Sequence, residues 1–347
     1  MMLGNVKKRI GMAARALRNG QAQAPPRRQV PPIQAADVLE VKAFFPMEKF
    51  FIFGHARSGT TLLTRLVRLH PEVHCNYQAH FFTRQPLLEG LVSDPGIGEW
   101  LARRSNRWNR GQDLSPLVLR AAADFILERE ARREGKRIVG DKSPNSLLEE
   151  ESVRLMHKVY PDARLVLIVR DGRDVAVSHR FQQFIDASQH LSGADLRIRA
   201  DFARQPEPYF AGDRSIFTPK SLRAEAVSWA KNVTQTGRVA RELYGDRYLY
   251  LRYEDLLESP LVELERIWIF LGAGPVSPSL VEAVASELAR NPDADWQMHK
   301  AGDLVGPLEK GKRGSWRSLF TASDRQAFKE LAGQALVDWG YEQGLEW

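Results

Sequence analysis

The fold is decided by residues 50–61, which read Phe50-Phe51-Ile52-Phe53-Gly54-His55-Ala56-Arg57-Ser58-Gly59-Thr60-Thr61. The four apolar residues at the start predict a buried strand. The apolar residues after the loop recur at the spacing of a helix: Leu62, Leu63, Leu66, Val67 and Leu69. A glycine loop between a strand and a helix offers free amide N–H groups and the positive end of the helix dipole to an anion. We therefore expect this loop to hold a phosphate or a sulfate.

The loop lacks the lysine of the nucleotide-hydrolysing pattern G-x-x-x-x-G-K-[ST], which reaches the outer phosphates. Thr60 stands in the lysine position, and Arg57 supplies positive charge three residues earlier. The loop is therefore poorly equipped for Mg-ATP.

The rest of the chain alternates predicted strands with predicted helices. We expect strands within 74–82 and at 136–140, 164–169 and 248–251. We expect helices at 115–134, up to 160, and at 174–187, 221–243, 260–271, 278–290 and 322–338, with 84–116 and 190–220 irregular. Apolar strands alternating with helices predict a parallel sheet covered on both faces. The fold class is α/β, a single domain over residues 48–347 with a P-loop-like nucleotide-binding core.

The net charge of +7 belongs to the N-terminus and not to the predicted domain. Residues 1–30 contain seven basic residues and no acidic one, so that 43 basic residues face 43 acidic ones in the remainder. We expect residues 1–47 to be a basic, flexible tail, which leaves open a weak contact with an anionic membrane surface or nucleic acid. The sequence contains no apolar run long enough to span a membrane and a single cysteine, Cys75, from which we expect a soluble cytoplasmic protein.

Three basic or glycine-containing loops follow predicted strands, at residues 54–59, 140–145 and 170–174. Ligands in open α/β sheets lie beyond the carboxyl ends of the strands, so these loops predict a pocket for a polyanion. Arg170 ends a strand and Ser178 lies eight residues later, where the two side chains could hold a second phosphate. A solvated strand end with a surface serine is the alternative.

These residues resemble a sulfotransferase that uses 3′-phosphoadenosine 5′-phosphosulfate (PAPS). The stretch from Arg57 to Thr61 resembles that family's 5′-phosphosulfate loop, and Arg170 with Ser178 resembles its 3′-phosphate motif. Residues 253–255, Tyr-Glu-Asp, are similar to another family element. Lys310-Gly311, followed by Gly314 and Trp316, resembles the C-terminal loop that closes over the nucleotide. The resemblance spans about residues 50–340 and is closest in style to the protein-tyrosine and carbohydrate branches and to soluble bacterial members.

The resemblance implies a cofactor site of Arg57, Ser58, Gly59, Thr60, Thr61, Leu62, Arg170, Ser178, Lys310 and Gly311, with PAPS as sulfuryl donor and no metal. The sequence departs from the family at three positions. Ala56 replaces a proline, Glu309 replaces an arginine, and Gln78 stands where the tyrosine branch has its glutamate base. An amide cannot take a proton at neutral pH, so that a base for the acceptor must come from elsewhere.

Sulfuryl transfer needs a base and positive charge beside the leaving oxygen. Among His55, His74, His80 and His179 we expect His80 to be the base, because it follows the second strand in a loop beside Tyr77, Phe81 and Phe82. His55, inside the loop, is the second choice, and a packed or surface histidine is the alternative for both. Arg57 and Lys142 are the candidates for stabilising the leaving group.

The expected function is transfer of a sulfuryl group to a hydroxyl or amine, and no specific nucleic-acid partner is expected. Residues 77–110 and 190–220 would form the acceptor pocket, and their mix of side chains permits a small molecule, carbohydrate, lipid or peptide. The sequence leaves the oligomeric state open. A P-loop kinase or NTPase, or a nucleotide-binding protein without catalysis, stays as the alternative function.

Overall fold

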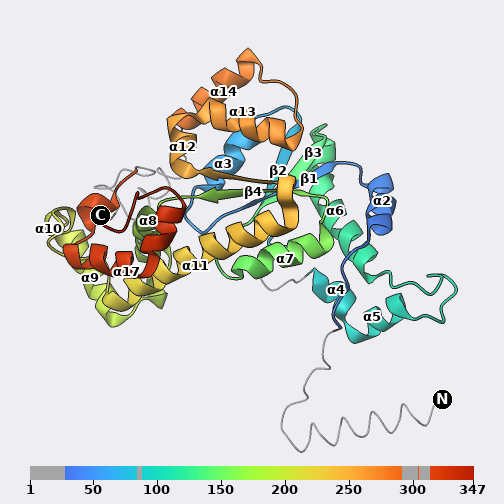
Figure 1. The fold of residues 1–347 in the computed structure, drawn as a ribbon, viewed down its shortest axis with the longest axis horizontal. Coiled ribbons are helices and arrows are strands. Elements are labelled where there is room, and N and C mark those ends of the chain that lie inside the picture. Colours follow the sequence, from blue (N-terminus) through green and yellow to red (C-terminus); the bar gives the residue numbers. More distant parts are fainter. Residues whose placement is uncertain (1–27, 84–87, 291–303, 305–312) are drawn as a thin grey trace, which may run out of the picture.

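The computed structural model describes residues 28–83, 88–290, 304 and 313–347, and its strands form one parallel sheet (Figure 1). The order across the sheet is β2-β3-β1-β4-β5. The strands are β1 (Glu48–Phe53), β2 (Val73–Tyr77), β3 (Ile138–Lys142), β4 (Arg164–Val169) and β5 (Tyr248–Arg252). Since β1 lies between β3 and β4 and all pairs are parallel, the three loops predicted to converge do leave the same edge.

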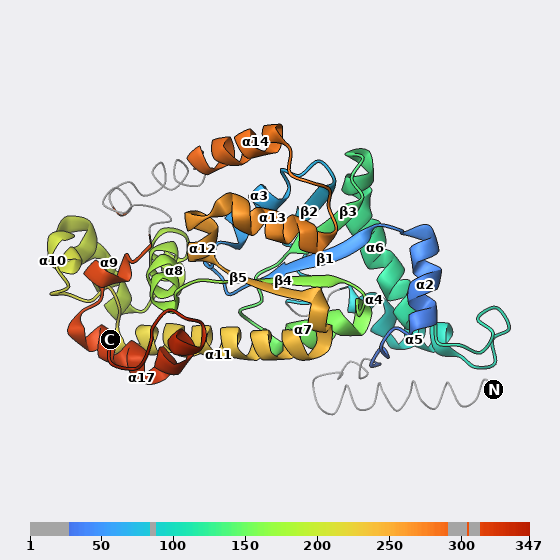
Figure 2. The ribbon, with the colours of Figure 1, turned by 45° about the horizontal axis from the view of Figure 1, so that its top comes forward.

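Helices cover both faces of the sheet, as the apolar strands predicted. In β1, Phe51 and Phe53 belong to one buried cluster, whereas Phe50 and Ile52 belong to the other. The first face carries α6, α7 and α11, and the second carries α3 and α13 (Figure 2). An all-apolar strand is therefore what this position requires, because successive side chains point to opposite, equally buried faces.

The predicted helices are present, within a few residues of their expected bounds, and the structure contains further helices that were not predicted. Their bounds are α2 (Ala35–Phe44), α3 (Thr60–Val67), α4 (Glu89–Ser93), α5 (Pro95–Ala102), α6 (Ser115–Arg133), α7 (Glu149–Val159), α8 (Gly172–Asp186), α9 (Gly193–Arg204), α10 (Glu207–Phe210), α11 (Pro219–Tyr244), α12 (Tyr253–Glu258), α13 (Pro260–Leu271), α14 (Pro278–Ala289), α16 (Trp316–Leu319) and α17 (Ala322–Asp338). No helix of the described ranges is long and apolar enough to cross a membrane.

Three stretches differ from the prediction. Residues 84–116 and 190–220 were predicted to be irregular, but the first contains α4 and α5 and the second contains α9 and α10. The signal for α9 was present in the sequence as a capping box, in which Ser192 and Asp195 satisfy each other's backbone N–H groups. The third strand begins two residues later than predicted, so that Asp141 and Lys142 belong to the end of β3.

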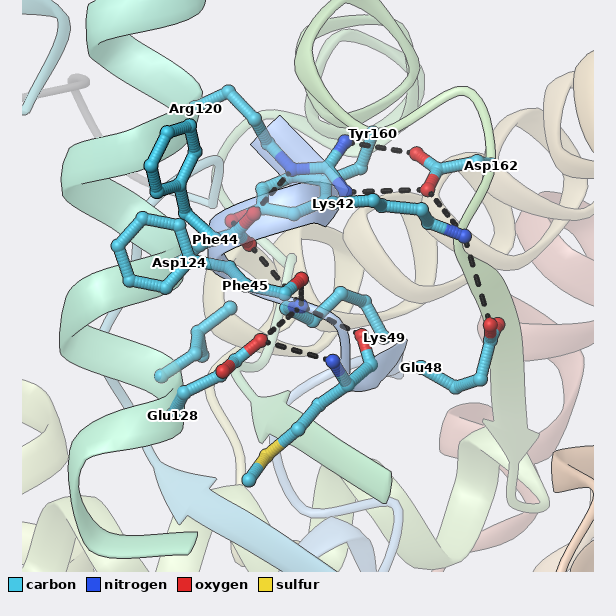
Figure 3. A network of polar contacts seen from close by, with 12 residues as sticks. Lys42, Phe44, Phe45, Glu48, Lys49, Arg120, Asp124, Glu128, Tyr160 and Asp162 are labelled. Carbon is cyan, nitrogen blue, oxygen red and sulfur yellow. Dashed lines mark hydrogen bonds and ion pairs between the residues drawn. The ribbon is translucent and has the colours of Figure 1, made fainter. Parts of the chain in front are cut away.

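The part of the predicted tail that the structure describes is packed on the domain. Val30 and Ile33 are buried, and α2 lies against α6. At the amino end of the sheet the Lys49 ammonium is buried 2.7 Å from Glu128 Oε1 (Figure 3). Lys42 of α2 lies 3.3 Å from Asp162. The prediction of a flexible tail up to residue 47 is therefore wrong for residues 28–47, because α2 contributes to the core and to this charge network.

Candidate anion-binding and catalytic site

Asn145, which follows β3, holds the start of the Gly54 loop by two hydrogen bonds. The Asn145 side-chain oxygen accepts a hydrogen bond from Gly54 N–H at 3.1 Å, and Asn145 N–H donates to the Gly54 carbonyl, also at 3.1 Å. The Asn145 amide then donates to Thr236 Oγ1 of α11 at 2.9 Å. A buried amide with its groups paired in this way holds the start of the loop in one position.

Gly59 ends the loop in the left-handed region, with φ of 87°, and caps α3. A Cβ on Gly59 would lie 2.5 Å from Cε2 of Tyr253, so the tyrosine ring occupies the space that a side chain would need. The Arg170 guanidinium lies over the Tyr253 ring, with its Cζ atom 4.8 Å from the centre of that ring. The glycine is therefore required both by the backbone angle and by the close approach of this ring.

The loop presents polar groups where α3 begins. The Ser58 hydroxyl is buried and has no hydrogen-bond partner among the described residues. Thr60, which is also buried, starts the helix, and Leu62 in the first turn packs against the second core cluster. A buried hydroxyl without a partner is rare in folded proteins. Its position beside a helix N-terminus is that of a ligand to an anion.

The structure brings the two predicted anion-binding elements together. Arg57, at φ of 73°, donates from Nε to Ser178 Oγ of α8 at 3.2 Å. Arg170 donates from Nη1 to the carbonyl of Arg57 at 3.3 Å. The Gly54 loop and the start of α8 therefore form one cationic surface, whose two arginines come from separate strand ends.

Lys142 joins this surface from β3. Its side chain is buried, and Nζ donates to Thr61 Oγ1 at 3.2 Å. The ammonium also lies 5.5 Å from the centre of the Tyr77 ring. Thus Arg57 lies in the loop itself, and the other two predicted cations, Lys142 and Arg170, contact the loop or its helix.

His80 follows β2 in a segment whose backbone is held by hydrogen bonds to Asp141 and Ser143. Its backbone N–H donates to Ser143 Oγ at 2.9 Å, and the Ser143 hydroxyl donates to Asp141 Oδ2 at 2.6 Å. The His80 ring places Nδ1 2.7 Å from Thr83 Oγ1. When Nδ1 carries the hydrogen and donates to Thr83, the basic lone pair lies on Nε2.

Asp141 was missed as a site residue. Its carboxylate accepts from Ala79 N–H at 3.0 Å and is buried, and burial raises its pKa to about 6. Gln78 and His80 both have positive φ, 55° and 53°. Asp141 therefore holds a strained turn in which Gln78 and His80 lie on either side of Ala79. The Gln78 side chain in this turn is exposed. The sequence signal was a carboxylate next to Lys142 at a strand end.

The other three candidate histidines, His55, His74 and His179, have defined partners. His55 is buried, with Nδ1 donating to the Ala56 carbonyl at 2.9 Å and Nε2 3.1 Å from Ser228 Oγ, and burial lowers its pKa. A ring bonded at both nitrogens can take a proton from an acceptor only by breaking one of these bonds. His74 lies 2.9 Å from Glu134, and His179 lies 2.8 Å from Glu225 through Nδ1.

The Tyr-Glu-Asp segment and the C-terminal segment meet at the start of α8. Glu254 accepts from Asp171 N–H at 3.1 Å and from the Tyr341 hydroxyl at 2.9 Å. Asp174 accepts from Gly314 N–H at 2.7 Å and from Trp316 N–H at 3.2 Å, and burial raises the pKa of its carboxyl. Lys310 and Gly311 lie outside the described residues. The described end of that motif thus reaches the helix that follows Arg170.

A model of the sulfotransferase family matches residues 49–274. Nodulation protein NoeE of Sinorhizobium fredii (strain NBRC 101917 / NGR234) is 24% identical over 302 residues, which are 85% of this chain and 66% of NoeE. Protein-tyrosine sulfotransferase 2 of Gallus gallus is 26% identical over 227 residues, which are 65% of this chain and 51% of that protein. The matched region thus covers slightly less than two thirds of the first relative and about half of the second. Among solved structures, mouse sulfotransferase SULT7A1 complexed with PAP is similar with a TM-score of 0.45 and 17% identity, covering 85% of this chain and 87% of that one.

Proposed function

The chain belongs to the sulfotransferase family, and from this membership we propose that it transfers a sulfuryl group from PAPS to a hydroxyl or amine acceptor. The observation that carries the proposal is the contact between two anion-binding elements. Arg57 of the Gly54 loop donates to Ser178, and Arg170 donates to the Arg57 carbonyl. A nucleotide with a 5′-phosphosulfate and a separate 3′-phosphate supplies two anions, and a single surface with two arginines suits both.

The residues present fit such a nucleotide. The buried Ser58 hydroxyl, which no described group satisfies, and the N-terminus of α3 would hold the 5′-phosphosulfate. Arg170 and Ser178 would hold the 3′-phosphate, with a planar guanidinium suited to bidentate phosphate recognition. PAPS, when bound, supplies the sulfuryl group and a phosphate leaving group.

We assign the charge stabilisation to Arg57 and Lys142. In the transfer, an acceptor oxygen or nitrogen forms a bond to sulfur while the bond from sulfur to the bridging phosphate oxygen breaks. Negative charge then grows on that phosphate, and fixed cations close to it lower the barrier. Lys142 is held against Thr61 in the first turn of α3, where its charge would lie beside the bridging oxygen.

We assign the base to His80, which takes the proton of the acceptor on Nε2. Its support is the anchoring of its backbone to Ser143, next to Lys142 in the chain. His179 is the alternative base, because Glu225 orients its ring through Nδ1. We expect His80→Ala to lower kcat by about a hundredfold or more while Kd for adenosine 3′,5′-bisphosphate (PAP) stays within about twofold. The same loss in His179→Ala, with His80→Ala unaffected, would move the assignment to His179.

Calorimetric titration tests the proposed function directly. PAP should bind without Mg²⁺ and more tightly than Mg-ATP does. A preference for Mg-ATP would overturn the proposal in favour of a kinase or NTPase. A screen of alcohols, phenols, amines, glycans and tyrosine peptides with ³⁵S-labelled PAPS should then transfer label to at least one class. PAP binding without transfer to any class would instead indicate a nucleotide-binding protein without catalysis.

A further inference from the structure

An exposed aromatic surface lies on α5 and the loop that follows it. Trp100 and Trp108 are 56% and 51% exposed, and their ring centres lie 4.8 Å apart. Leu91 of α4 and Ile97 of α5 are 55% and 44% exposed. We call Leu91, Ile97, Trp100 and Trp108 the Trp100 patch. Large apolar side chains gathered on a surface mark a place where something else binds.

The loop that carries Trp108 is held in one conformation by internal hydrogen bonds. Asn109 is buried, and its amide donates to the carbonyls of Leu101 at 3.1 Å and Gln112 at 2.9 Å. The Asn106 amide donates to the Trp100 carbonyl at 3.0 Å. These bonds hold Trp108 against Trp100 on the outside of the domain, although a turn with the indole facing inward would bury more apolar area.

The loop side of the patch is basic. Residues 100–112 include four exposed arginines, Arg103, Arg104, Arg107 and Arg110, and no acidic residue, whereas the exposed Asp94 and Glu99 lie on the helix side. Arg103 pairs with Glu99 at 2.9 Å, whereas the other three have no ion-pair partner in the described ranges. Indole rings beside arginines are typical of protein surfaces at the headgroup level of a bilayer, where the rings enter the interface and the cations meet anionic lipid.

The N-terminal segment enters the domain beside this patch. Arg28 forms an ion pair with Asp113, and it donates to Ser115 Oγ at 3.1 Å and to the Gly98 carbonyl of α5 at 3.3 Å. The 27 residues before it add six basic residues, and their apolar Leu3, Val6, Ile10 and Leu17 recur at intervals of three, four and seven. This pattern is typical of sequences that bind membrane surfaces.

We propose that the Trp100 patch and the arginines around it dock the protein onto an anionic lipid bilayer surface. The helix α5, which carries Ile97 and Trp100, lies toward the opposite end of the molecule from α8 in both views (Figures 1 and 2). Docking there leaves the anion-binding edge of the sheet accessible to PAPS and acceptor. Nucleic acid fits less well, because the two indole rings pack against each other, tilted by 30°, whereas base stacking requires an available ring face.

Sedimentation of the full chain with vesicles tests the proposal. The protein should bind vesicles containing about one third phosphatidylserine at least about tenfold more tightly than phosphatidylcholine vesicles, and less tightly as salt rises from about 0.1 M to 1 M. The triple variant Arg104→Gln/Arg107→Gln/Arg110→Gln should lose about fivefold per arginine. Trp100→Ala/Trp108→Ala should lose about tenfold at unchanged charge.

Matched substitutions elsewhere on the surface serve as controls. Phe125→Ala removes an equally exposed aromatic ring of α6, and Arg223→Gln removes an exposed arginine of α11, and both should bind vesicles like the wild type. Equal binding to neutral and anionic vesicles, or wild-type binding by the folded arginine variant, would overturn the proposal. Binding to a single-stranded oligonucleotide in place of vesicles, lost in the same variants, would overturn it in favour of nucleic acid. PAP affinity should stay unchanged in all variants, so that this result is independent of the proposed function.

Discussion

Gly59→Ala tests the geometry of the anion-binding loop. The substitution adds two costs at one position. The alanine must adopt φ of 87°, and its Cβ would lie 2.5 Å from Cε2 of Tyr253, so that the ring or the loop must move. Tyr253 lies under Arg170, whose guanidinium donates to the Arg57 carbonyl. A displaced ring therefore disturbs both anion-binding elements at once.

The two costs can be separated with a control glycine. Gly135, at the end of α6, has φ of 67°, and nothing lies within 4 Å of a Cβ built on it. Gly135→Ala should thus carry only the left-handed backbone cost of about 1–2 kcal/mol. That corresponds to a loss of a few degrees in Tm, with unchanged affinity for PAP. Gly59→Ala should carry the same backbone cost and, in addition, weaken PAP binding at least about tenfold, or about 1.4 kcal/mol.

The assay is calorimetric titration of PAP without Mg²⁺, combined with thermal unfolding of each variant. Tyr253→Leu in the Gly59→Ala background should recover part of the affinity, because it removes the ring that the new Cβ meets. If folded Gly59→Ala bound PAP within about twofold of the wild type, the loop would not be the nucleotide site and the reasoning would fail.

Two further substitutions probe β3. Lys142→Met should lower the turnover number by about a hundredfold, the equivalent of one preorganised donor worth about 3 kcal/mol, while PAP affinity stays within about threefold. Lys231→Met, at an exposed lysine of α11, is the control. Equal turnover in the two variants would remove Lys142 from the mechanism. The pKa of Asp141 is raised to about 6 by burial, so that the folded state keeps a proton that the unfolded state releases above about pH 4. The free energy of unfolding should therefore fall as pH rises from about 4 to 6, by at most about 3 kcal/mol from this group. In Asp141→Asn this contribution should vanish in urea unfolding, and an unchanged pH dependence would contradict the buried carboxyl.

Much of the fold could be predicted from local signals. The apolar run 50–53, the glycines of the loop and the helical spacing after Thr60 indicated β1, the turn and α3, because each signal acts on neighbouring backbone. The helix α9 was missed although its capping box is present, since prolines and glycines on either side obscured it. The place of α2 was missed for another reason. Whether Val38 and Val41 face solvent or α6 depends on partners about 80 residues away.

The sequence by itself determined which residues are the candidates for the chemistry of this protein: two arginines and a lysine at or just after strand ends, a glycine loop before a helix, and a serine eight residues after Arg170. Only the tertiary structure decided how they meet. Asn145 fixes Gly54 across 91 residues of chain, Tyr253 fills the space above Gly59, and Asp174 holds Gly314 beside the α8 N-terminus. The physical reason is that residue type and spacing act through the local backbone, whereas these contacts depend on the order of the strands across the sheet. That order places β1 between β3 and β4.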